Sequence, residues 1–249
     1  MAQIIAMHSH RGGTGRSTLA ANLARLMADD GHRVALVDTD IQSPAAYALF
    51  GGTRAPDRTL ADYLVGRCEV EEAALTVPAV SGGAELYLVP ARAEASGIHE
   101  IIAQGYDVGL LREGFDRLIE ELRLDVLLLD THAGINNETV TAVASADTLA
   151  VVTRSCRLDL LGAGETVEFA AQLGCPRRVL LVNMVPPGVS QELAGQRAGA
   201  AYGTPVEAAL PYAPELAMAA GAQLFVDAYP DHPLVERFRK IIPSLVPRR

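Results

Sequence analysis

A glycine-rich turn near the start of the chain limits its fold more than any other feature. An apolar run over residues 4–7 leads into the sequence RGGTGRST at residues 11–18, and apolar residues at helical spacing follow as far as Met27. Glycines let a backbone turn tightly and bring its N–H groups close to a polyphosphate. The following helix adds its unpaired N–H groups and the positive end of its dipole. The order strand, loop, helix therefore predicts a phosphate-binding loop.

The predicted loop differs from the ordinary motif G-x-x-x-x-G-K-[ST] at two positions. His10 stands where the first glycine is expected, and Arg16 stands where the lysine is expected. The deviant motif K-G-G-x-G-K-[ST]-T fits better, with arginine at both lysine positions, 11 and 16. On these residues the chain resembles the MinD/ParA family of dimerising P-loop ATPases. A glycine-rich turn that binds nothing is the alternative interpretation of the loop taken alone.

The resemblance implies a role for the residues of this loop. Arg11 would reach across a dimer to the phosphates of the partner, and Arg16 would serve the nucleotide of its own chain. The hydroxyl of Ser17 would reach Mg²⁺. The residues that would hold the ATP are Gly12, Gly13, Thr14, Gly15, Arg16, Ser17 and Thr18.

Two aspartates follow the second predicted strand, which covers residues 33–37. Side chains two apart share one side of an extended strand, so Asp38 and Asp40 would both face the crevice at the carboxyl edge of a parallel sheet. A solvated pair that opens a turn before Pro44 is the alternative. The resembling family has D-x-D here, which implies that Asp40 orients the attacking water and that Asp38 supports the metal or the loop.

A third acidic position closes the apolar run over residues 126–129. The carboxylate of Asp130 would hold the Mg²⁺ shell through water, because Mg²⁺ keeps several waters. The family pattern at this place is D-[ST]-P-A-G, and His132 replaces the proline. A polar contact near the γ-phosphate and a tolerated variant are both open for His132, so no catalytic role is assigned to it.

Two weaker signals concern the adenine base. The predicted strand over residues 178–183 ends in Asn183, and the resemblance implies that its amide reads the adenine edge. A turn-forming asparagine before two prolines is the alternative. The run over residues 210–215, which includes Pro211, resembles the family's loop beside the adenine.

The chain of 249 residues is expected to form a single domain, residues 1–249. Hydrophobic residues make up 49% of it and aromatic residues only 5%, which suits an aliphatic parallel sheet buried between helices. Alternating strands and helices predict an α/β fold with a doubly wound, mostly parallel sheet. The resemblance implies a P-loop NTPase of the SIMIBI type. Strands are expected over residues 3–7, 33–37, 85–90, 125–130, 148–153, 178–183 and 206–211, and helices over 16–30, 59–66, 70–75, 98–122, 136–146, 159–173, 190–201, 215–220 and 233–245.

Composition argues against several other classes. The net charge of −9 argues against a protein that binds nucleic acid mainly through charge, although a local patch on a dimer could bind DNA non-specifically. The three cysteines form no C-x-x-C pair, so we expect buried free thiols and no zinc or metal-carrier motif. No signal segment or membrane-spanning run is visible, which predicts a cytoplasmic protein. The candidate basic residues for DNA are scattered: Arg92, Arg112, Arg117, Arg123, Arg177 and Arg178.

The last predicted helix has an apolar face beside a basic one. A helix docked on the core is the favoured interpretation, since amphipathicity is the default for a surface helix. The alternative is a membrane-surface helix of the kind that ends MinD proteins. Pro243 and Pro247 are expected to interrupt it.

The two arginines decide what activity the resemblance implies. Arg11 keeps the charge and reach needed for a partner's phosphate. Arg16 is bulkier than lysine, and a small misplacement could slow phosphoryl transfer by ~100-fold. We therefore expect an ATP-dependent homodimer switch with slow ATP hydrolysis, in which Arg11, Arg16 and Asp40 are catalytic and ATP and Mg²⁺ are the cofactors. It would position a cellular cargo through a protein adaptor, peripherally at the membrane or nucleoid if it binds either. A hydrolysis-deficient nucleotide-gated scaffold, a P-loop ligase and a metal carrier are the alternatives.

Overall fold

An eight-stranded sheet forms the centre of the computed structural model, which describes residues 2–78, 82–92, 109–219 and 223–246. The strand order is β3-β4-β2-β5-β1-β6-β7-β8, and every pair is parallel except β3 with β4. The sheet is therefore doubly wound and mostly parallel, as predicted. The strands are β1 Gln3–His8, β2 Val34–Asp38, β3 Leu75–Val77, β4 Leu86–Val89, β5 Val126–Asp130, β6 Thr148–Arg154, β7 Arg177–Val185 and β8 Val206–Pro211.

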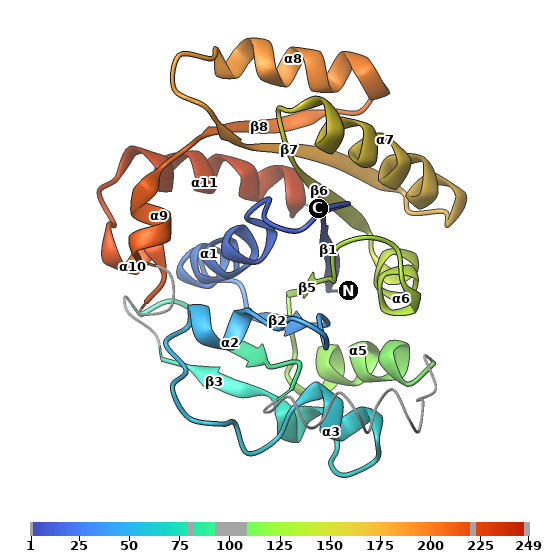
Figure 1. The fold of residues 1–249 in the computed structure, drawn as a ribbon. Helices are drawn as coiled ribbons and strands as arrows, with labels where there is room; N and C mark the ends of the chain where they lie inside the picture. Colours follow the sequence, from blue (N-terminus) through green and yellow to red (C-terminus); the bar gives the residue numbers. More distant parts are fainter. Residues whose placement is uncertain (1, 79–81, 93–108, 220–222, 247–249) are drawn as a thin grey trace.

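Helices cover both faces of this sheet (Figure 1). One face packs against α1 Arg16–Asp29, α2 Ala46–Leu49, α9 Pro214–Ala219, α10 Phe225–Ala228 and α11 Pro233–Leu245. The other packs against α3 Leu60–Leu64, the 3₁₀ helix η1 Val70–Ala73, α5 Gly109–Glu121, α6 Asn137–Ser145, α7 Arg157–Gln172 and α8 Gln191–Tyr202. The core on each face is mainly Ala, Val, Leu and Ile, which agrees with the aliphatic composition.

Local sequence signals explain several helix boundaries. The side chains of Thr59, Asn136 and Ser190 each accept a hydrogen bond from a backbone N–H in the first turn of α3, α6 and α8. The expected stop of α1 at Gly31 is confirmed, because Gly31 adopts a left-handed φ of 96° directly after the helix.

Other expectations were wrong or incomplete. The helix expected over residues 70–75 is the short η1 followed by β3, which pairs with the edge of β4, and α10 was not expected. Of the helix expected over residues 98–122, α5 is confirmed, while residues 98–108 lie outside the described part. Pro243 does not interrupt α11, which runs through it to Leu245.

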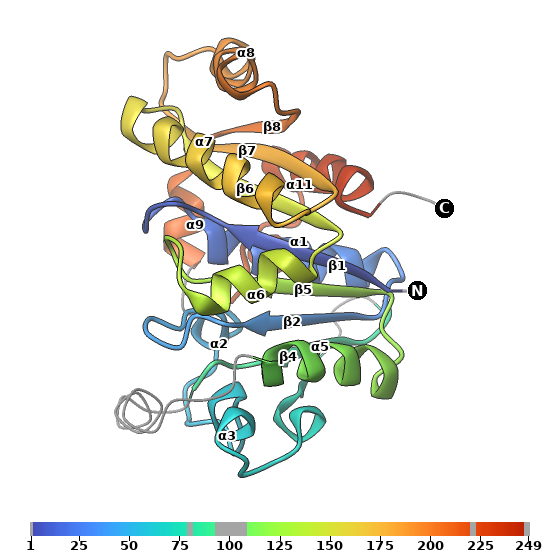
Figure 2. The same ribbon diagram turned by 90° about the vertical axis from the view of Figure 1, so that its right-hand side faces the viewer.

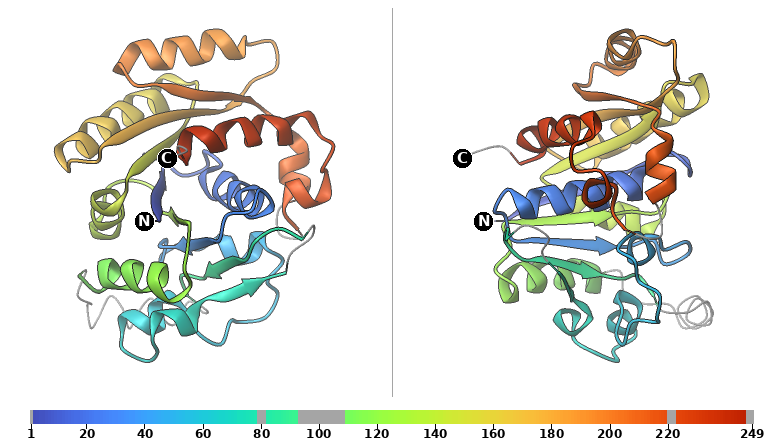
Figure 3. Two further views of the ribbon diagram at one scale, coloured as in Figure 1. Left: turned by 180° about the vertical axis from the view of Figure 1, so that it is seen from behind. Right: turned by 90° about the vertical axis from the view of Figure 1, so that its left-hand side faces the viewer.

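The last helix is docked on the core, as the favoured interpretation predicted. Its apolar residues Leu234, Phe238 and Ile241 are buried, and α11 lies beside α1 (Figure 3). Phe238 packs edge-on against Phe225 of α10, with ring centroids 6.2 Å apart. The face proposed for a membrane surface is therefore in contact with the protein itself. No helix in the described ranges combines the length and the apolar character needed to cross a bilayer.

Replacing Phe238 tests the docking of α11. Phe238→Ala should lower the free energy of unfolding by about 3–5 kcal/mol, since it removes a fully buried aromatic side chain. The exposed neighbour Lys240 supplies the control, and Lys240→Ala should change stability by no more than about 0.5 kcal/mol. Urea unfolding followed by circular dichroism measures both. Equal, small losses in the two variants would contradict a docked helix.

Candidate functional site

The functional residues predicted from sequence meet at the carboxyl edge of the central strands, where β1 and β2 end on the same side (Figure 2). In register, Asp38 at the end of β2 lies beside Asp130 at the end of β5, and Asp130 lies beside Met7 of β1. A pocket of about 370 Å³ opens here. It is lined by Ser9, residues 12–18, Asp40, Ser43, His132 and Ala133.

The backbone of the loop is shaped to present N–H groups to this pocket. Gly13 and Gly15 adopt left-handed φ angles of 76° and 83°, which other residues rarely reach. A Cβ atom at Gly15 would lie 2.5 Å from the amide nitrogen of Asn183, so this position also needs glycine for space. The side-chain oxygen of Thr14 is buried and makes no hydrogen bond within the described structure. Open amides and an unpaired hydroxyl at the start of α1 fit a polyphosphate.

Arg16 makes the contacts that the sequence did not reveal. Its Nε donates to Oδ1 of Asp130 at 2.6 Å, and its Nη2 lies 3.3 Å from Oδ2 of Asp40. The same Nη2 donates to Oγ of Ser17 at 3.1 Å. The side chain is only 8% exposed. The guanidinium of Arg16 thus contacts Asp40, which is expected to be catalytic, and also Ser17 and Asp130, which are expected to hold the metal.

Asp38 is buried and faces the backbone of the segment that follows β2. Its carboxylate accepts hydrogen bonds from the N–H groups of Asp40, Ala45 and Ala46, each at 3.0 Å. Burial and the nearby charge of Asp130 raise the pKa of Asp38 to about 8. These contacts favour support of the loop among the two roles left open for Asp38, and metal binding by this residue stays a prediction.

Burial shifts the pKa values of two ionisable groups near Arg16, His8 and Asp130. Burial, followed by the charge of Arg16, lowers the pKa of His8 to about 3, so this imidazole is neutral near pH 7. Nδ1 of His8 lies 2.7 Å from the hydroxyl of Thr131. Burial also raises the pKa of Asp130, whereas Arg16 acts in the opposite direction. The side chain of His132 lies at the pocket, with Nε2 4.0 Å from Oδ1 of Asp40, and its role stays open.

The two arginines of the loop point to different places. Arg11 is half-exposed and is absent from the lining of the phosphate pocket, whereas Arg16 is part of it. Nε of Arg11 lies 3.9 Å from Oδ1 of Asp159, at the start of α7. Asp159 also pairs with Arg154 at the end of β6.

A smaller, more apolar pocket of about 160 Å³ adjoins the loop. It includes both residues expected near an adenine, Asn183 and Pro211, together with Met184 and Tyr212. The amide of Asn183 donates to the carbonyl of Thr14 at 2.8 Å, so it braces the loop. Whether it also reads a base stays a prediction, but the pocket has the size and apolar lining that a planar base requires.

The donors expected to hold Mg²⁺ are hydroxyl and carboxylate oxygens, the chemistry that this ion prefers. Of the three residues expected to hold the metal, Ser17 and Asp130 are in contact with Arg16, whereas Asp38 binds backbone N–H groups. Oδ2 of Asp130 is buried and makes no hydrogen bond within the described structure, so an oxygen donor stays open at this site and the residues present fit both a nucleotide's phosphates and Mg²⁺.

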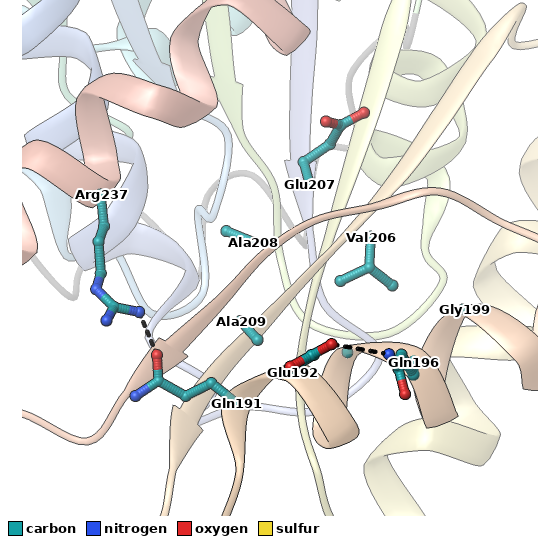
Figure 4. A pocket seen from close by; sticks show the side chains of 10 residues that line it. Gln191, Glu192, Gln196, Gly199, Val206, Glu207, Ala208, Ala209 and Arg237 are labelled. Atoms are coloured by element: carbon teal, nitrogen blue, oxygen red, sulfur yellow. Dashed lines mark hydrogen bonds between the residues drawn. The ribbon is translucent and has the colours of Figure 1, made fainter.

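A larger pocket of about 650 Å³ lies away from the loop, between α8, β8 and α11 (Figure 4). Arg237 hydrogen-bonds to Gln191, and Gln196 donates to Glu192 at 3.2 Å. Glu207 pairs with Arg177 at 3.0 Å. The polar side chains named here therefore already have partners within the protein.

The structure changes two expectations from the sequence, that the cysteines are buried and that scattered arginines could bind DNA. Cys175 is buried, but Cys156 is exposed and Cys68 is partly exposed, so the expectation of buried thiols was wrong for those two. In the described part of the chain, no group of three or more His, Cys, Asp or Glu side chains is arranged to hold a metal ion by itself. Several arginines considered for DNA instead pair with carboxylates on the protein: Arg112 with Asp116, Arg117 with Glu69 and Glu71, and Arg177 with Glu207.

Comparisons with known proteins agree with this geometry. The family model described as AAA domain matches residues 2–174. The uncharacterised ATP-binding protein MJ0547 of Methanocaldococcus jannaschii is 29% identical over 99% of this chain and 88% of its own length. The antiactivator FleN of Pseudomonas aeruginosa is 37% identical over 60% of this chain and 50% of its own, and the chromosome partitioning protein ParA of Caulobacter vibrioides is 29% identical over 60% and 55%.

A solved structure with the same fold is that of the septum site-determining protein MinD of Pyrococcus horikoshii complexed with Mg-ADP. It has a TM-score of 0.80 and 22% identity over 98% of this chain and 96% of its own. The family match over residues 2–174 shows that the chain belongs to the AAA domain family, and its glycine-rich loop, its acidic strand ends and its sequence relatives make it a MinD/ParA-like P-loop ATPase.

Proposed function

We propose that the protein is an ATP-dependent dimerisation switch with slow ATP hydrolysis that positions or regulates a cellular cargo. The proposal rests mainly on one observation. The loop forms a phosphate pocket, and Arg11 of the same loop lies outside that pocket. Relatives named as an antiactivator and as a chromosome partitioning protein support a regulatory or positioning role. A protein effector or adaptor would then link the switch to its cargo.

The nucleotide would occupy two adjoining pockets. The amides of Gly12, Gly13 and Gly15 and the start of α1 would bind the phosphates, with Thr14, Ser17 and Thr18 around them. Asn183 and Pro211 would border the base in the apolar pocket. Asp40 lies at the phosphate pocket, where its carboxylate would orient the attacking water.

Arg11 would complete the site of a second copy. Its contact with Asp159 spans 3.9 Å and involves a half-exposed guanidinium, so the contact is weak and the side chain is free to turn outward. Exposed apolar residues lie in the segment before α6 and in α7, the helix that holds Asp159: Ile135, Leu158 and Leu161. Exposed apolar residues can bury surface against a second copy, and Arg11, which does not line the phosphate pocket of its own chain, could then reach the nucleotide of that copy.

One observation favours the hydrolysis-deficient scaffold as a second candidate. Arg16 lies within 3.3 Å of Asp40, the residue expected to orient water. The contact occupies Oδ2 of Asp40, so fewer of its lone pairs are available to that water. Binding and dimerisation would then persist without turnover.

The protein would act in the cytoplasm, and its placement at a membrane or nucleoid would depend on a partner. The helix α11 is docked on the core, and three of the arginines considered for DNA, Arg112, Arg117 and Arg177, pair with carboxylates of the protein.

Replacing Arg11 tests the dimer. With a non-hydrolysable ATP analogue, the wild type should double its mass in light scattering, and Arg11→Ala should remain monomeric while still binding the analogue. Arg197 on the exposed side of α8 supplies the control, and Arg197→Ala should dimerise normally. Dimers of the Arg11 variant, or a wild type that stays monomeric, would contradict the proposed switch.

Replacing Asp40 separates slow hydrolysis from none. Phosphate release by the wild type should be slow but above background, and Asp40→Ala should lower it by ~100-fold or more, to background, since an oriented base contributes at least that much. The exposed Asp57 gives a matched variant, and Asp57→Ala should release phosphate at the wild-type rate. Equal background release by wild type and Asp40→Ala would exclude the ATPase and leave the scaffold.

A further inference from the structure

We propose that His132 is a further catalytic residue that holds, together with Asp40, the water that attacks the γ-phosphate. The proposal deepens the proposed function and rests on it, because it concerns hydrolysis in the same phosphate pocket. His132 stands where the pattern D-[ST]-P-A-G has proline, whose side chain has no hydrogen-bonding group. The imidazole is therefore an addition of this chain to the site.

One ring nitrogen of His132 is open to the pocket. The side chain lines the phosphate pocket and is 27% exposed, but its Nδ1 is buried and makes no hydrogen bond within the described structure. Nε2 is therefore the nitrogen that a ligand in the pocket can reach. It lies 4.0 Å from Oδ1 of Asp40, which lines the same pocket.

This separation suits a shared water better than a direct contact. At 4.0 Å, Nε2 of His132 and Oδ1 of Asp40 are too far apart to hydrogen-bond each other. A water about 2.8 Å from each atom fits between them, and bridging waters of this kind bind nearly as well as direct partners. Hydrogen bonds to both atoms use two of the four bonding directions of the water. A lone pair of its oxygen then remains for the phosphorus.

Asp40 alone has little capacity to orient this water. Its Oδ1 accepts from the N–H of Ser43 at 2.8 Å, and its Oδ2 lies 3.3 Å from Nη2 of Arg16. A carboxylate has about four acceptor positions, so Oδ1 keeps one further position for a water. A single hydrogen bond does not fix the orientation of a water, because the molecule can still turn about that bond. Nε2 of His132, as the second partner, removes this freedom.

The turn that carries His132 is fixed to the first strand and the phosphate loop. The N–H of Thr131 donates to the carbonyl of Met7 at 3.2 Å, and the N–H of Gly134 donates to the carbonyl of Ser9 at 3.1 Å. These two hydrogen bonds lie on either side of His132. The imidazole is thus carried by backbone that is held against the loop, and catalysis of phosphoryl transfer depends mostly on such positioning.

The two side chains orient the water and end the reaction unchanged. The bond from the water oxygen to the γ-phosphorus forms as the bond from that phosphorus to the leaving oxygen of ADP breaks. One hydrogen of the water stays on the phosphate product, and the other is released to solvent as a proton. ATP and water thus give ADP, inorganic phosphate and a proton.

Rates and affinities of variants at position 132 test the proposal. Phosphate release is measured at saturating ATP in magnesium chloride, and the affinity for a non-hydrolysable ATP analogue is measured by titration calorimetry in the same buffer. His132→Leu should lower phosphate release by about tenfold or more and change the affinity by less than about twofold, because the water loses a partner and the nucleotide does not. His132→Gln should stay within about threefold of the wild-type rate, since its amide places a polar group near the position of Nε2.

Two further variants complete the set. His32 precedes β2 at the opposite edge of the sheet, and His32→Leu should leave both quantities unchanged. His132→Asn has a shorter amide that ends near the position of Nδ1, so it should lose the rate as His132→Leu does, and it replaces that variant if the leucine prevents folding.

The outcomes that would overturn the inference differ from those that would overturn the proposed function. Unchanged phosphate release in His132→Leu, with loss of release in Asp40→Ala, would refute the role of His132 and leave the ATPase intact. Equal losses in His132→Leu and His132→Gln would also refute it, as would a loss of affinity that matches the loss of rate. Background release by the wild type would remove the inference and the proposed hydrolysis together.

A transition-state analogue gives a second readout. ADP with aluminium fluoride resembles the γ-phosphoryl group during attack by water. His132→Leu should bind ADP alone as the wild type does, which also shows that the variant is folded. It should bind ADP with aluminium fluoride about tenfold more weakly, since a group that acts in the transition state contributes to the binding of its analogue. The same effect on both ligands, or no effect on either, would contradict the proposal.

Discussion

The ion pair between Arg16 and Asp130 connects the two parts of the sheet edge on which the site depends. Arg16 begins α1, directly after the phosphate loop, and Asp130 ends β5, 114 residues later. The parallel pairing of β1, β5 and β2 brings these ends to one edge, with Asp38 beside Asp130. Because both charges are buried, loss of either partner would cost about 3–5 kcal/mol. The positions of the loop and of the acidic strand ends therefore depend on each other.

The C-terminal part of the chain fixes the direction of α1 and hence of the loop. Asn22 in α1 donates to the carbonyl of Thr18 at 2.7 Å and accepts from the N–H of Val226 in α10 at 2.9 Å. Arg25, one turn further on, lies 3.4 Å from Asp227. With α11 packed alongside, α1 is held between the sheet and the end of the chain. A nucleotide bound at the start of α1 would thus be coupled to α10 and α11, far from it in sequence.

The sequence predicted most of the fold because its signals are local. Apolar runs located seven of the eight strands, and the helices expected to begin at residues 59 and 136 do begin there, with Thr59 and Asn136 as their capping residues. The short β3 lacks such a signal, since its three residues pair only with β4 at the sheet edge. Pro243 was expected to end a helix, yet it lies on the exposed side of α11 in the last turns, where water can satisfy the freed carbonyl.

The site was predictable in its residues but not in their contacts. The motif spacing identified the loop, Asp40 and Asp130; the structure places residues 12–18 and Asp40 around one pocket, and Asp130 is buried in contact with Arg16 of that pocket. The sequence could not show that Arg16 would contact Asp130 and Ser17, because that depends on the register of strands far apart in the chain. It also could not decide between metal and loop support for Asp38, whose partners are backbone amides that carry no sequence signature.

Backbone amide shifts on addition of ADP test the central claim most directly, because they report on the N–H groups that are proposed to bind phosphate. In ¹⁵N–¹H spectra of the labelled protein, the largest changes should occur at Gly12, Gly13 and Gly15. The glycines of the larger pocket on α8, Gly195 and Gly199, should change little and serve as an internal control. Unchanged loop amides, or shifts confined to Gly195 and Gly199, would contradict the account.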